Sequence, residues 1–180
     1  MKMTKYLMTS LFAVALGTSS AFTLADVDAE DFVEEASAKN ISEIEAGKLA
    51  LDKSTFPAVK TFAQKMINEH SANNTELRSL ATRKKVTLSD DAELTSKAKA
   101  AILKQRDGES FDVAYANNQV AAHKSAIEFY KEAAKSTDAD VRTFAVAALP
   151  KLQHHLQDAE KLVSELAKSD TVDSTAEKNN

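Results

Sequence analysis

The chain has 180 residues, 23 of them basic and 27 acidic, which leaves a net charge of −4 at pH 7. This balance argues against a nucleic-acid-binding protein, because such a protein needs a basic face for the phosphates. The sequence contains no cysteine, which excludes disulfide bonds and thiol chemistry.

Residues 1–25 have the layout of a secretory signal peptide. Lys2 and Lys5 precede an apolar stretch over residues 6–16, and small residues follow it. The stretch is too short for a transmembrane helix, which needs about 20 apolar residues, and no later stretch is apolar enough. We predict cleavage after Ala25 and a periplasmic or secreted protein without an integral membrane segment. Removing the two lysines leaves 21 basic and 27 acidic residues, a net charge of −6.

The rest of the chain is rich in helix-forming residues and is broken at four places. The breaks are STFP (54–57), KKVTLSDDAE (84–93), RDGES (106–110) and STDAD (136–140). They predict helices over 28–53, 56–83, 90–105, 110–135 and 138–168. Pro150 should kink or restart the last helix. The polar tail, residues 169–180, is expected to be disordered.

This pattern predicts an all-α fold with one domain over residues 26–168. The four long helices should form an up-down four-helix bundle, with the short helix 90–105 inserted between the second and third. In an up-down-up-down bundle the two short turns lie at the same end.

Two adjacent histidines show how helical periodicity separates inward from outward residues. His154 and His155 point about 100° apart on a helix. The apolar stripe that contains Leu152 and Leu156 places His155 at its rim and His154 towards water. The same reasoning turns one titratable group inward on each of the other long helices: Glu43, His70 and His123. Glu45 should face outward.

If both short turns lie at one end, the helical rise places the four inward groups about 18 to 27 Å from it, so that they could share one layer. Three imidazoles and one carboxylate suit a divalent transition metal such as zinc, copper or iron. Two other interpretations are open. The layer could be a buried hydrogen-bond network completed by Asn73 or Gln119, or a core that responds to pH.

No sequence motif identifies catalytic residues. The sequence has no Glu-x-x-His pair, which ferritin-type di-iron centres require on two helices. It also lacks the Gly-x-Ser-x-Gly and His-Glu-x-x-His motifs. We therefore expect a protein that is not an enzyme.

Three segments, FAQKMINEH, FDVAYANNQVAAH and ALPKLQHHL, occur in this order. Together they resemble a bacterial family of exported proteins, the domain-of-unknown-function family 4142, from about Asp31 to Val163. The resemblance implies a ferritin-like fold and picks out the same inward residues, with His155 rather than His154. It implies no particular activity.

Two functions are compatible with these observations. The first is a small exported protein that binds a transition metal through Glu43, His70, His123 and His155. The second is a non-catalytic envelope or stress-related interaction protein, whose Glu/His layer is a structural network. The protein partner is not indicated by the sequence.

Overall fold

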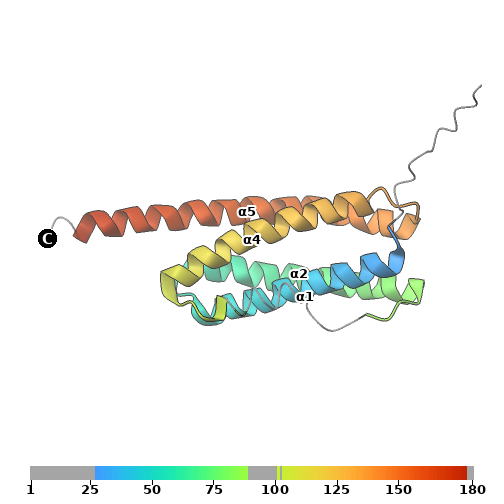
Figure 1. Cartoon of the computed structure of the whole chain (residues 1–180), viewed down its shortest axis with the longest axis horizontal. Helices are drawn as coiled ribbons and strands as arrows, with labels where there is room; N and C mark the ends of the chain where they lie inside the picture. Colours follow the sequence, from blue (N-terminus) through green and yellow to red (C-terminus); the bar gives the residue numbers. More distant parts are fainter. Residues whose placement is uncertain (1–26, 89–100, 102, 178–180) are drawn as a thin grey trace, which may run out of the picture.

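The computed structural model describes residues 27–88, 101 and 103–177, and side chains as far as residue 169. In this part of the chain there are four long helices and no strand: α1 (Ala29–Lys53), α2 (Pro57–Lys84), α4 (Gly108–Ala133) and α5 (Ala139–Glu177). They lie side by side as a bundle (Figure 1). The predicted all-α four-helix bundle is confirmed.

Local chemistry explains where three of the helices begin. The side chain of Asp28 accepts a hydrogen bond from the backbone N–H of Glu30 and caps α1. Pro57 occupies the first turn of α2, where its missing N–H has no intrahelical partner to lose. Asp138 caps α5 by accepting from the N–H groups of Asp140 and Val141 at 2.9 and 3.3 Å.

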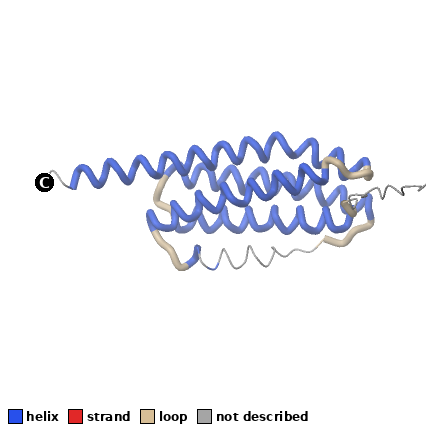
Figure 2. Tube along the Cα trace, turned by 45° about the horizontal axis from the view of Figure 1, so that its top comes forward, coloured by secondary structure: helices blue, strands red, loops and turns tan. Residues whose placement is uncertain are grey.

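The directions in which the helices run differ from the prediction. The turn between α1 and α2 and the turn between α4 and α5 lie at opposite ends of the bundle (Figure 1). The expectation that they lie at the same end is wrong. The loops 85–88 and 105–107 also lie at opposite ends (Figure 2). The connection from α2 to α4 is therefore long enough to cross the bundle, so that α4 runs parallel to α2.

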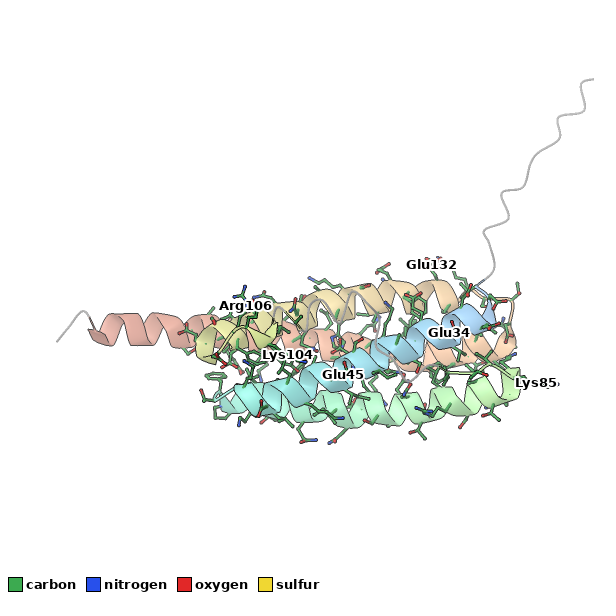
Figure 3. All side chains as sticks on the ribbon, turned by 60° about the horizontal axis from the view of Figure 1, so that its bottom comes forward. Glu34, Glu45, Lys85, Lys104, Arg106 and Glu132 are labelled. Atoms are coloured by element: carbon green, nitrogen blue, oxygen red, sulfur yellow. The ribbon has the colours of Figure 1, made fainter. Side chains whose placement is uncertain are left out.

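The core consists of two apolar clusters, one in each half of the bundle. The first joins the start of α1 and α5 to the end of α2 and α4, and includes Phe32, Leu80 and Tyr130. The second joins the opposite ends of the same helices and includes Met66 and Phe111. Charged side chains such as Glu34, Glu45 and Glu132 lie on the outside (Figure 3), as predicted for Glu45. The residues between the two clusters form the middle of the bundle.

The last helix is longer than the sequence predicts. A helix ending at 168 and a disordered tail were expected, but α5 continues to Glu177 and projects beyond the other helices (Figure 1). No glycine or proline follows Pro150, so neither of these helix-ending residues stops the helix at 168. The helix also continues through Pro150 itself.

Two predictions fall largely outside the described residues. The signal peptide, residues 1–25, lies outside them entirely and remains a prediction. Most of the predicted inserted helix 90–105 also lies outside the described residues. Residues 101, 103 and 104 of it are described, and they are helical. Within the described part of the chain, no helix is both long enough and apolar enough to cross a membrane.

Candidate metal centre

Three histidines from three helices meet in the middle of the bundle, between the two apolar clusters. His70 comes from α2, His123 from α4 and His155 from α5. One ring nitrogen of each lies within 4.8 Å of those of the other two, and the ring centroids are 5.3 to 5.6 Å apart. All three side chains are buried, as helical periodicity predicts, whereas His154 is exposed.

Each of the three imidazoles uses one ring nitrogen for a hydrogen bond to an oxygen atom. His70 Nδ1 bonds to Asn40 Oδ1 at 2.9 Å, and His123 Nδ1 to the backbone carbonyl of Gln119 at 2.9 Å. His155 Nε2 bonds to Glu69 Oε2 at 2.8 Å. Because these oxygens can only accept, the nitrogen that faces them must carry the proton.

The other nitrogen of each ring is then an unprotonated acceptor. These atoms are His70 Nε2, His123 Nε2 and His155 Nδ1, and all three are buried without a hydrogen-bond partner. A buried acceptor without a partner costs about 1–3 kcal/mol. A divalent transition metal would satisfy all three at once, because it binds the unprotonated nitrogen of neutral imidazole. The residues present therefore fit such an ion.

The surroundings keep His70 and His155 neutral at neutral pH. Burial lowers the pKa of His70 well below its usual value, and the neighbouring His123 and His155 lower it further. The pKa of His155 is lowered to about 4, mainly by burial, although the hydrogen bond to Glu69 acts in the opposite direction. Metal binding therefore requires no deprotonation of these two rings at neutral pH.

The structure brings together three of the four predicted ligands. Glu43 is not part of the group of three histidines. Its carboxylate is half-buried, Oε2 has no partner, and its charge acts on Tyr115. On α1 it is Asn40, three residues earlier, that contacts the cluster through His70.

Sequence reasoning missed two residues that orient the cluster. Asn40 was not singled out, although it lies at helical spacing from the buried residues Val33, Ala36 and Ser37 on the same face. Its own NH2 group donates to Asn73 Oδ1 at 2.9 Å, while its Oδ1 faces His70. Glu69 precedes His70 and lies at the rim of the inward face of α2, so periodicity alone did not identify it as a partner of His155.

Glu69 connects the buried cluster to an ion-pair network on the surface. Burial tends to raise its pKa, but the hydrogen bond from His155 and nearby lysines lower it overall, so that Glu69 is a carboxylate. Its Oε1 lies 3.9 Å from Lys65 Nζ. Lys65 also binds Asp158 at 2.7 Å and contacts His154 Nδ1 at 3.0 Å.

The fold and the site define an all-α bundle with a buried three-histidine cluster in its middle. The chain belongs to the family described as domain of unknown function DUF4142, which matches residues 14–162. This confirms the family resemblance of the sequence. None of the curated proteins matches the chain in sequence.

Two solved structures are similar to this one. The first is a DUF305 protein from Streptomyces coelicolor described as secreted, with a TM-score of 0.66 and 14% identity over 78% of this chain and 94% of that one. The second is CopM in its Cu(II)-bound form, with a TM-score of 0.66 and 12% identity over 78% of this chain and 98% of that one. At these identities the likeness concerns the fold.

Proposed function

We propose that this protein is an exported, non-catalytic metal-binding protein that holds one divalent transition metal ion on His70, His123 and His155. The observation that carries the proposal is the set of three buried, unpartnered ring nitrogens within one cluster. Each opposite nitrogen is held by an oxygen acceptor, and such hydrogen bonds orient metal-binding histidines in general. Glu43, predicted from the sequence as a fourth ligand, is not needed for this arrangement.

Copper is the first candidate for the ion. Imidazole nitrogens suit copper, zinc and iron, and among divalent ions the affinity of such a site is greatest for Cu²⁺. The similar structure of CopM is a Cu(II)-bound form, which supports the same choice. Zinc is the alternative, because three histidines with an open position also suit Zn²⁺.

Export and a ferritin-like architecture are part of the same proposal. Lys2, Lys5 and the apolar stretch 6–16 support a signal peptide, and one of the similar proteins is described as secreted. One long crossover between the second and third long helices is the connection that ferritin-like bundles use. The opposite positions of the two short turns support it (Figure 1).

The test is the metal content of residues 26–180, which include all four described helices, purified without chelator and after copper is added. We expect about one ion per chain and a higher melting temperature, since a ligand at 100 times its dissociation constant stabilises by about 2.7 kcal/mol. His155→Ala should lose both. His154→Ala is the matched control, because it removes the adjacent exposed ring, and it should keep both.

If the protein holds no ion, and copper and zinc leave its melting temperature unchanged, the proposal is wrong. The layer is then a structural network, as in the interaction-protein alternative. In that case His70→Ala should destabilise the protein by about 1–3 kcal/mol whether or not metal is present, because Asn40 Oδ1 loses its hydrogen-bond partner.

A further inference from the structure

A small cavity lies beside the three-histidine cluster, between α2 and α5. Its volume is about 70 Å³, and both His70 and His155 line it. Lys151 and Glu76, whose side chains are exposed, line it as well. The cavity therefore connects two of the three candidate ligands to the surface.

The cluster offers a metal ion three nitrogen ligands, fewer than the four of a closed site. It contains three histidines and no carboxylate. The carboxylate of Glu69 accepts a hydrogen bond from His155 and is already used in that contact. Three protein ligands with a fourth position taken by water or another small molecule are the pattern of open metal sites.

The size of the cavity limits what could take this position. One water molecule needs about 10–15 Å³ of cavity volume. A cavity of 70 Å³ therefore has room for about five water-sized molecules. An inorganic anion of two to four atoms fits this space, and a sugar or peptide does not.

The charges around the cavity favour an anion. Three neutral imidazoles leave the charge of a divalent ion in place, and the carboxylate of Glu69 offsets only one unit of it. Lys151 lines the cavity, and its ammonium lies near enough to His70 and Glu69 to lower the pKa of both. The exposed carboxylate of Glu76 repels an anion, but solvent screens this negative charge at the surface.

Two neutral groups in the wall add hydrogen-bond donors. Asn73 accepts from Asn40 through Oδ1, which leaves its NH2 group to donate. Burial raises the pKa of Tyr130, so its hydroxyl stays protonated.

We propose that this cavity binds a small inorganic anion next to the metal ion, and that this anion completes the coordination of the ion. The inference rests on the proposed function, because it needs an ion on the three histidines. The bound anion can then exchange with the solvent through the cavity, from the α2–α5 side. Lys151 then acts as a residue that selects for anions.

The experiment adds azide, as a small anionic probe, to residues 26–180 loaded with Cu²⁺. We expect a saturable charge-transfer absorption band and a change in the copper electron paramagnetic resonance spectrum. Lys151→Met should weaken azide binding by about threefold to tenfold, because one nearby charge is lost. Lys161→Met, which removes the same charge elsewhere on α5, should leave it unchanged.

A second variant tests the cavity itself. Ala148 lines the cavity, so Ala148→Leu should fill part of it and weaken azide binding while copper still binds. Ala121→Leu is the matched control, because Ala121 is exposed on α4. Circular dichroism checks that each variant is folded.

The outcomes separate the two proposals. If the protein does not bind copper, the proposed function fails and this inference fails with it. If copper binds to the three histidines but azide does not change its spectrum, only this inference is overturned. It is also overturned if azide binds equally well to the wild type, Lys151→Met and Ala148→Leu.

Discussion

Glu69 is the residue that fixes the ring of His155, through a hydrogen bond of 2.8 Å between His155 Nε2 and Glu69 Oε2. Glu69→Gln keeps an acceptor oxygen but removes the charge that strengthens the bond. Loss of such an orienting partner typically lowers metal affinity by about 10- to 100-fold. We expect this reduction for copper in a competition titration with a chelator.

The matched control for this change is Glu45→Gln, because Glu45 is exposed on the outside of α1 (Figure 3). Copper affinity should be unchanged in this variant. An affinity of Glu69→Gln within twofold of the wild type would show that Glu69 does not orient a metal ligand.

Burial of His155 makes the stability of the metal-free protein depend on pH. The pKa of this ring is lowered from 6.5 to about 4 in the folded state. Below pH 6.5 the unfolded chain therefore binds a proton that the folded protein does not, so stability is complete above pH 6.5 and falls between pH 6.5 and 4. The loss from this residue alone is up to about 3 kcal/mol.

Urea unfolding of the metal-free protein at a series of pH values measures this effect. His155→Gln should remove part of the decrease, because it removes one group that titrates differently in the two states. A free energy of unfolding that stays constant from pH 7 to pH 4.5 would contradict the prediction.

At the scale of elements, the contact between α1 and α2 depends on a glycine. A Cβ atom at Gly47 would lie 2.7 Å from Ile67 Cγ1 and 3.0 Å from the backbone oxygen of Ala63. Alanine is a better helix former by about 1 kcal/mol, but overpacking typically costs about 1–3 kcal/mol. We expect Gly47→Ala to destabilise the protein by up to about 2 kcal/mol in urea unfolding.

A double-mutant cycle with Ile67→Ala shows whether the close contact is the cause. If it is, Gly47→Ala should cost less when Ile67 is already shortened, and the two changes should not be additive. If Gly47→Ala stabilises the wild type, helix propensity outweighs the contact and the prediction is wrong.

The helices themselves were largely predictable. The first three long helices begin and end within two residues of the predicted bounds, because breaks such as STFP and RDGES are local signals. The end of α5 was not predictable from polarity alone. Residues 169–177 are polar, but they contain no helix-breaking residue, and polarity by itself does not end a helix.

At the scale of the whole molecule, the three histidines link the two helical hairpins. His70 belongs to the α1–α2 hairpin, and His123 and His155 belong to the α4–α5 hairpin. A bound ion should therefore oppose separation of the hairpins. We expect metal at 100 times its dissociation constant to slow hydrogen exchange by about 100-fold for amides that exchange only when the hairpins separate.

The part of α5 that projects beyond the other helices provides the internal control (Figure 1). Its amides past residue 169 should exchange at the same rate with and without metal, because none of the other described helices packs beside them. If metal slows exchange in the α4–α5 hairpin alone, the ion does not join the two hairpins.

The helical class, the single bundle and the inward direction of His70, His123 and His155 follow from the sequence by itself. These properties depend on local composition and on the spacing of apolar residues at the helical period of 3.6 residues. Both can be read from the residues of each helix alone. The tertiary structure alone decided the path of the chain across the bundle, and with it which side chains share the middle layer. It brought Asn40 and Glu69 to His70 and His155 as hydrogen-bond partners, because such contacts depend on how helices far apart in the sequence pack against one another.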